Sequence, residues 1–169
     1  LDRLLGPQNK ALNETNPSIN AKLPRTEDNP GGGRVKALHK AIVPPGRNHA
    51  INIRLYEQKP VLPEWLVERQ ALSAGMMATL RQAMESGKRL LITGGTRTGK
   101  TTMLSALCNF LPGGWRILKI EDPEEIWIDR PTVQTVEARP QAVGTEVRPY
   151  TLADGVDDAM RMSPDYLII

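Results

Sequence analysis

The first third of the chain has the two-residue hydrophobic period of β-strands. From Ile51 to Tyr56 apolar and polar residues alternate, which is typical of a half-buried strand. Runs with strand character occupy residues 18–23, 35–43 and 50–56. We therefore predict a small, mainly antiparallel, β-rich domain over residues 1–57.

From residue 58 onwards the pattern alternates between helix and strand. Residues 58–72, rich in proline at their start, predict a linker with a short helix at 63–69. Ser73 is expected to cap a helix that ends near Gly87, because apolar residues recur at helical spacing between them. The further expected elements are strand 89–93, helix 101–111, strand 116–120, strand 132–138, helix 151–162 and strand 165–169. This alternation predicts an α/β fold with a largely parallel sheet over residues 73–169.

Composition limits the classes of protein that fit. The chain has 169 residues and a net charge of +3, too small an excess to indicate a nucleic-acid surface. No run approaches the roughly 18 apolar residues of a membrane span. The single cysteine, Cys108, excludes an intramolecular disulfide and is expected in the core. His39 and His49 have no metal-site spacing, so metal use is expected only as Mg²⁺ held with a nucleotide.

Residues 94–101 fit the phosphate-binding pattern G-x-x-x-x-G-K-[ST], between an expected strand and an expected helix. In such a loop, backbone N–H groups and the helix N-terminus face the phosphates. Lys100 is expected to reach the β- and γ-phosphates, and the Thr101 hydroxyl to bind Mg²⁺. The expected ATP contacts are Gly94, Gly95, Thr96, Arg97, Thr98, Gly99, Lys100, Thr101 and Thr102. The alternative, a glycine-rich turn with a surface lysine, is disfavoured by this context.

An acidic segment, residues 121–125, directly follows the expected strand 116–120. Carboxylates at the carboxyl end of a strand near a phosphate loop are suited to hold Mg²⁺ or the attacking water. Glu121 and Asp122 are the expected catalytic carboxylates, beside Lys100. Thr101, Glu121 and Asp165 are the expected metal ligands. The alternative for the segment is a solvated acidic turn.

Several segments together resemble the secretion and pilus-assembly ATPases of type II and type IV systems. The segments that carry the resemblance are 92–102 for Walker A, 120–125 for the acidic "Asp box", 159–165 for the approach to Walker B, and 34–45 with 51–54 for the N-terminal domain. The resemblance covers about residues 18–169.

This resemblance implies a RecA-like P-loop core preceded by a small N-terminal domain. It also implies hexameric rings in the cytoplasm, peripheral to the inner face of the cell membrane, whose partners are inner-membrane components of a secretion or pilus machine. ATP and Mg²⁺ are the implied cofactors. Arg34 and Arg54 match arginines that reach the nucleotide phosphates in relatives.

The chain departs from the family pattern at two places. Arg97-Thr98 stands where relatives carry Gly-Ser, and the chain ends at Ile169, before the Walker B glutamate. The leading interpretation is an ATP-hydrolysing motor subunit. A nucleotide-binding assembly module without turnover is the alternative that the early end favours. A small P-loop phosphotransferase is a further alternative, although the acidic segment and the β-rich leader are unusual for it.

Overall fold

The computed structural model describes residues 10–141 and 146–169, and the chain divides into two compact units. The first unit comprises the described residues of Leu1–Lys59 and Arg139–Tyr150. The second comprises Pro60–Ala138 and Thr151–Ile169.

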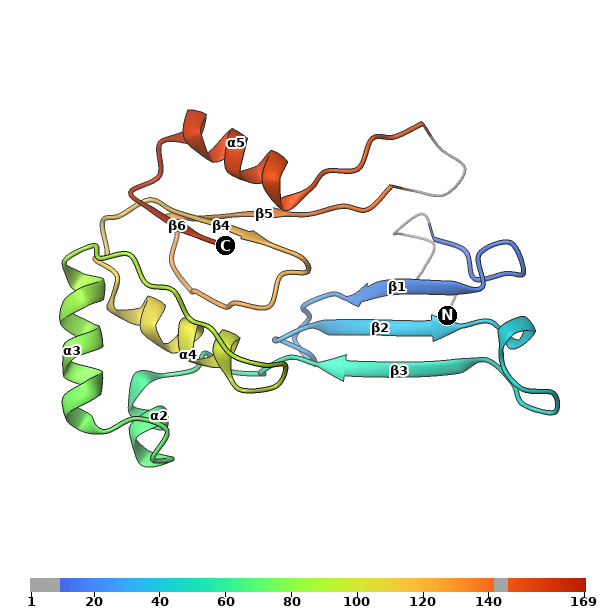
Figure 1. Ribbon diagram of the computed structural model, residues 1–169, viewed down its shortest axis with the longest axis horizontal. Helices are drawn as coiled ribbons and strands as arrows, with labels where there is room; N and C mark the ends of the chain where they lie inside the picture. Colours follow the sequence, from blue (N-terminus) through green and yellow to red (C-terminus); the bar gives the residue numbers. More distant parts are fainter. Residues whose placement is uncertain (1–9, 142–145) are drawn as a thin grey trace. The chain divides into compact units, whose positions relative to one another are not determined.

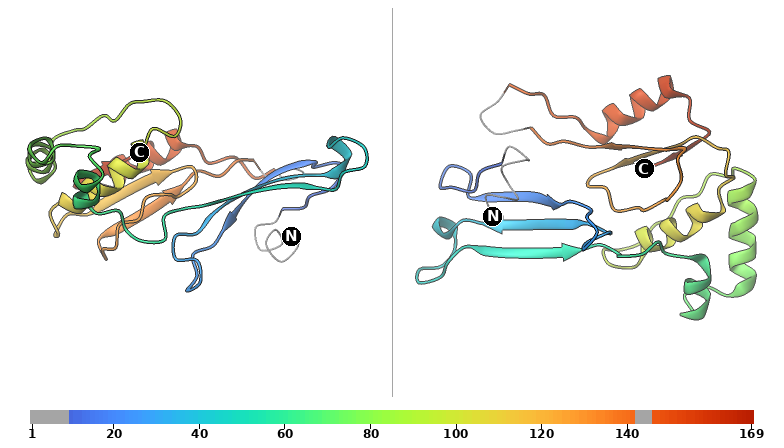
Figure 2. Two further views of the ribbon diagram at one scale, coloured as in Figure 1. Left: turned by 90° about the horizontal axis from the view of Figure 1, so that it is seen from below. Right: turned by 180° about the vertical axis from the view of Figure 1, so that it is seen from behind.

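The first unit is built on an antiparallel sheet in the order β1-β2-β3 (Figure 2). The strands are β1 (Ser18–Leu23), β2 (Gly33–Leu38) and β3 (Ala50–Leu55). The strand expected at 35–43 is shorter, because a 3₁₀ turn, η2 (Lys40–Ile42), follows it. The ring nitrogen Nδ1 of His39 accepts the amide N–H of Ala41 at 3.2 Å and so caps this turn.

Burial in this sheet is concentrated on β1 and β2. Ala21, Val35 and Ala37 are almost fully buried, whereas every residue of β3 is exposed. Ile53 and Leu55 each expose 59% of their area, so the expectation of a half-buried strand here is wrong. The physical reason is that β3 lies at an edge of the sheet, while the described apolar side chains that cover the sheet pack against Ala21 and Val35.

The run Gly31-Gly32-Gly33 is explained by a close backbone approach. A Cβ added at Gly33 would lie 2.5 Å from the carbonyl oxygen of Arg54, and one added at Gly31 would lie 2.1 Å from that of Glu57. No side chain fits at either position, so these glycines allow β3 and its continuation to run against β2.

The second unit contains a parallel sheet in the order β5-β4-β6. Its strands are β4 (Ile117–Glu121), β5 (Val133–Glu137) and β6 (Tyr166–Ile168), close to the expected ranges. Successive residues of β4 point to opposite faces. Leu118 and Ile120 pack with Ala159 of α5 (Leu152–Met162), whereas Ile117 joins the core on the other face.

Three further helices complete this unit: α2 (Pro63–Glu68), α3 (Ala74–Glu85) and α4 (Lys100–Leu107), the last followed by the 3₁₀ turn η3 (Cys108–Phe110). Ser73 caps α3 as expected, with its hydroxyl accepting the amide N–H of Met76. The main core cluster of buried residues is Leu66, Leu72, Met77, Met84, Ala106, Leu107, Cys108, Leu111, Ile117, Ile126 and Ile168.

The strand expected at 89–93 is not formed in the structure. Leu90 and Ile92 pack against the core, but Leu91 is 89% exposed, and the run pairs with none of the described strands. Only one face of this apolar run is thus partly buried.

Candidate functional site

The loop at 94–99 turns sharply into α4 (Figure 1). Three of its residues have positive φ: Gly94 at 156°, Arg97 at 63° and Gly99 at 89°. Gly99 is the N-cap of α4 and offers no side chain to the first amide groups of the helix. These N–H groups therefore remain available at the positive end of the helix dipole.

Lys100 lies across this loop. Its ammonium donates to the carbonyl oxygen of Gly95 at 2.6 Å, and the Thr98 hydroxyl donates to the same oxygen at 2.9 Å. The loop is thereby closed on itself by two side chains of the expected phosphate-binding motif, within a segment whose residues 93–99 are all exposed.

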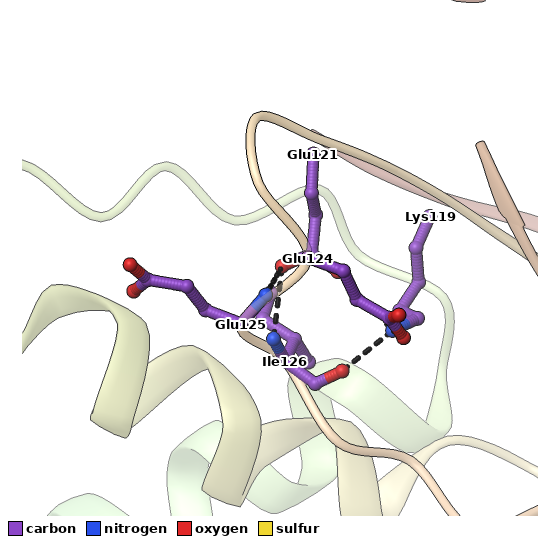
Figure 3. Close-up of polar contacts among 5 residues, drawn as sticks. All are labelled: Lys119, Glu121, Glu124, Glu125 and Ile126. Atoms are coloured by element: carbon purple, nitrogen blue, oxygen red, sulfur yellow. Dashed lines mark hydrogen bonds and ion pairs between the residues drawn. The ribbon is translucent and has the colours of Figure 1, made fainter. Parts of the chain in front are cut away.

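The acidic segment forms a buried polar network with Lys119 (Figure 3). One carboxylate oxygen of Glu121 accepts from the ammonium of Lys119 at 3.1 Å. The other accepts the amide N–H groups of Glu125 and Ile126, both at 2.9 Å. Lys119 also donates to Glu124 at 2.9 Å and to the carbonyl oxygen of Ile126 at 2.5 Å. Both oxygens of Glu121 are thus engaged by the protein itself.

Asp122 differs from Glu121. Its side chain is exposed and makes no hydrogen bond or ion pair within the part of the chain that the structure describes, and the Asp122–Pro123 peptide is cis. Of the two carboxylates expected to be catalytic, Asp122 is the one directed to solvent.

Asp165 lies at the start of β6, beside the start of β4. Its carboxylate accepts the backbone N–H of Arg116 at 2.8 Å and the guanidinium Nε at 3.3 Å. These hydrogen bonds hold the pKa of the Asp165 carboxyl below its usual value. Glu121 ends β4, and because each strand residue advances the chain by about 3.3 Å, the two carboxylates lie at opposite ends of the sheet.

The expected metal ligands are therefore not brought together. β4 and α4 run in opposite directions, so the N-terminus of α4 with Thr101 lies toward the end of the sheet where Glu121 stands (Figure 1). Asp165 lies at the far end, so the structure does not bring it together with Thr101 and Glu121. Among the described residues no group of three or more His, Cys, Asp or Glu side chains forms a metal site.

The first unit carries a row of cations across its sheet. Arg34 of β2 is directly opposite Arg54 of β3 and directly opposite Lys22 of β1. Like charges in such positions repel each other. Sequence reasoning singled out Arg34 and Arg54 but missed Lys22, which becomes evident only from the register of β1 against β2.

Lys119 was also missed. The signal available in the sequence was a lysine inside the apolar run of 117–120, two residues before the first glutamate of the acidic segment. A lysine at an inward position of a buried strand needs carboxylate or carbonyl partners.

The mixed α/β fold with a parallel sheet and the phosphate-loop motif together describe a broad class of proteins. Comparison with known proteins shows to which family within this class the chain belongs. The family model described as "Type II/IV secretion system protein" matches residues 14–169, and the chain belongs to this family. The resemblance found in the sequence is thus confirmed.

Individual relatives agree with this assignment. The "Uncharacterized protein MJ0781" of Methanocaldococcus jannaschii is 31% identical over 95% of the chain and 22% of its own length. The "Type IV secretion system protein VirB11" of Bartonella quintana is 34% identical over 53% of the chain and 25% of its own length. The matched part thus spans about a quarter of the length of each of these relatives.

A solved structure, the pilus retraction motor PilT with bound ADP, superimposes with a TM-score of 0.56 over 89% of the chain and 38% of PilT, at 18% identity. This likeness shows the fold. Among the described residues, no helix has the length and apolar character needed to cross a membrane.

Proposed function

We propose that the chain is the ATP-binding and ATP-hydrolysing part of a motor of a type II or type IV secretion, conjugation or pilus-assembly system. The observation that carries the proposal is the loop at 94–99, whose left-handed Gly99 opens α4 directly at Lys100 and Thr101 within a chain of this family. The proposed organisation is a small N-terminal domain (1–57), a linker (58–72) and a RecA-like core (73–169).

The residues of the loop fit the phosphates of ATP. The exposed segment 94–99 offers backbone N–H groups, and the ammonium of Lys100 can exchange its hydrogen bond to the Gly95 carbonyl for one to a phosphate oxygen. The Thr101 hydroxyl, in the first turn of α4, would help to hold Mg²⁺, which would neutralise phosphate charge. That Arg34 and Arg54 reach the phosphates stays a prediction that the family resemblance implies.

A carboxylate of the acidic segment completes the proposed site. The carboxyl end of β4 and the N-terminus of α4 lie toward the same end of the sheet, which supports a role for this segment beside the phosphates. Its part in hydrolysis would be to orient the attacking water.

We further propose that the protein assembles as a homo-hexameric ring in the cytoplasm, at the inner face of the cell membrane. Its partners there would be inner-membrane components of the secretion or pilus machine. Family membership over residues 14–169 supports these proposals.

One observation favours a second candidate function, that of a nucleotide-binding assembly module that does not hydrolyse ATP. Both oxygens of Glu121, the expected catalytic carboxylate, are engaged by Lys119 and by backbone N–H groups. A chain that relied on Glu121 for hydrolysis would then bind ATP without cleaving it.

Binding and hydrolysis are separated by two measurements on the same variants. Lys100→Ala should weaken binding of a fluorescent ATP analogue with Mg²⁺ by at least about a hundredfold, because charge-assisted phosphate contacts are strong. Lys88→Ala, which removes an exposed lysine away from the loop, is the matched control and should bind normally. Phosphate release by the unmodified protein then distinguishes a motor from a binding module. Normal affinity in folded Lys100→Ala would contradict the nucleotide site itself.

A further inference from the structure

Lys119 is the largest fully buried side chain of the described chain, with 2% of its area exposed. Lysine is almost never fully buried unless it is paired. Here it lies on β4, the central strand of the parallel sheet, two residues before the acidic segment.

The ammonium of Lys119 has three protons to donate and three acceptors around it. These acceptors are the carboxylates of Glu121 and Glu124 and the carbonyl oxygen of Ile126, at distances between 2.5 and 3.1 Å (Figure 3). All three belong to the segment that leaves the carboxyl end of β4, so one buried cation gathers this segment around itself.

Glu121 continues the network toward the backbone. Its second oxygen accepts the amide N–H groups of Glu125 and Ile126, which closes the segment into a tight loop over the end of the strand. Glu121 is 8% exposed, so its carboxylate is paired and hydrogen-bonded inside the protein and does not face solvent. Breaking such a pair on one side leaves an uncompensated buried charge, which is strongly unfavourable.

Asp122 is the carboxylate that this arrangement leaves outside the network. It follows the anchored Glu121 immediately, its side chain is exposed, and it has no partner within the described ranges. Its position is fixed by the residues on both sides, while its oxygens remain available.

We propose that Lys119 and Glu121 are positioning residues that fold the acidic segment, and that Asp122 is the carboxylate of this segment that acts on water or Mg²⁺. This inference rests on the proposed ATPase function and changes the role of Glu121 within it. Lys119 acts on the reaction only through the placement of Asp122.

The first test measures the segment directly and needs no turnover. In the full-length protein, a glutamate-specific protease should cut Lys119→Met after Glu124 and Glu125 at least about tenfold faster than the unmodified protein, because the segment loses its central cation. Cleavage after Glu85, at the end of α3, should stay unchanged and serves as the internal reference. Lys119→Arg should restore protection in part, and Lys88→Met is the matched control. Equal cleavage of the segment in Lys119→Met and the unmodified protein would overturn the proposal.

A milder variant covers the case in which Lys119→Met unfolds and is cut at every glutamate. Glu124→Gln removes the charge of the most exposed partner of Lys119, whose side chain is 31% exposed, and keeps the buried pair with Glu121. Faster cleavage after Glu125, the site of this pair that the variant keeps, supports the network as the anchor of the segment. No acceleration there counts against the proposal.

The second test separates binding from catalysis. Lys119→Met and Asp122→Asn should each lower kcat for ATP hydrolysis by about tenfold or more, while the Kd for ATP changes by less than about threefold. Lys119→Arg should recover part of the rate. Undiminished kcat in Asp122→Asn would remove Asp122 from the reaction. If the unmodified protein binds ATP but releases no phosphate, the proposed motor function fails, while the protease result still decides whether Lys119 positions the segment.

Discussion

At the scale of single residues, Arg97 stands out because it has a left-handed backbone, with φ at 63°. For a residue with a Cβ this conformation costs about 1–2 kcal/mol, which glycine avoids. Arg97 lies in the exposed loop that precedes α4, so this backbone strain lies within the proposed phosphate site.

Arg97→Gly should therefore stabilise the protein by about 0.5–1 kcal/mol, the relief of strain being partly offset by the greater freedom of glycine in the unfolded chain. Urea denaturation checks this. Arg89→Gly, at an exposed position without positive φ, is the control and should lose stability. A loss of stability in both variants would show that the loop adapts to Arg97 without strain.

Cys108 illustrates the effect of burial on a reactive group. It is 0% exposed, and burial, the largest cause, raises the pKa of its thiol to about 12 from 9.0. At pH 8 the thiolate fraction is lower than that of an ordinary thiol by about a thousandfold. Cys108 should thus react with a thiol reagent only when the second unit unfolds. The rate of labelling should therefore rise with the urea concentration. Rapid labelling of the native protein would contradict its place in the core.

Asp165 gives a pH dependence with a definite sign. Its folded pKa is lowered by the hydrogen bonds from Arg116, so its contribution to stability is present above the unfolded pKa of about 4 and is lost as the pH falls through the folded value. Asp165→Asn should be less stable than the unmodified protein at pH 7, and the difference should shrink below pH 4. An equal loss of stability at pH 7 and at pH 3 in Asp165→Asn would contradict this sign.

At the scale of elements, the contact between α5 and β4 is closest at Gly155. A Cβ added there would lie 2.7 Å from Cγ2 of Ile120, whose side chain is buried. The helix begins with a capping box between Thr151 and Asp154, so α5 is fixed one turn before this contact.

Gly155→Ala should destabilise the protein by about 1–3 kcal/mol, because the added methyl group forces the buried Ile120 or the helix to move. Gly75→Ala in α3 is the matched control: nothing lies within 4 Å of its added Cβ, and the helix should gain about 0.4–1 kcal/mol. Denaturant unfolding of the two variants measures both changes in the free energy of unfolding. A gain in both would show that α5 shifts on the sheet at little cost.

Element boundaries were predictable where local signals act alone. Ser73 begins its helix with the expected side-chain cap, and the strand expected at 116–120 is β4 at Ile117–Glu121, all of whose residues are buried. Residues 89–93 were misjudged because the period of an apolar run does not reveal whether a partner strand lies beside it. The same limit applies to the burial of β3, which depends on what covers the sheet.

The site was predictable as a motif but not as a geometry. The pattern of 94–101 located the loop, whereas the role of Glu121 depends on Lys119 and on two backbone N–H groups that spacing does not reveal. Asp165 was assigned to the metal because it opens an apolar strand, yet only strand direction decides at which end of the sheet it lies.

At the scale of the whole molecule, the second unit carries the proposed nucleotide loop and all three tryptophans of the chain, Trp65, Trp115 and Trp127. Tryptophan fluorescence therefore reports the unfolding of this unit. ATP binding can therefore be detected as a rise in the free energy of unfolding of this unit, without a measurement of hydrolysis.

ATP with Mg²⁺ at a hundred times its Kd should raise the free energy of unfolding seen by tryptophan fluorescence by about 2.7 kcal/mol. Lys100→Ala should lose this stabilisation at the same ATP concentration, and Lys88→Ala should keep it. An equal shift in Lys100→Ala would mean that the nucleotide binds elsewhere.

The exposed apolar side chains of β3 affect the solubility expected of the purified protein. Ile51, Ile53 and Leu55 lie on an edge strand, whose outer backbone groups can pair with another chain. An apolar edge strand is a starting point for aggregation, and charged side chains are the usual protection against it. On the other face of β3 only Arg54 supplies charge, so Arg54→Ala should make the purified protein precipitate at lower concentration, and lysine in place of Ile53 should keep it in solution.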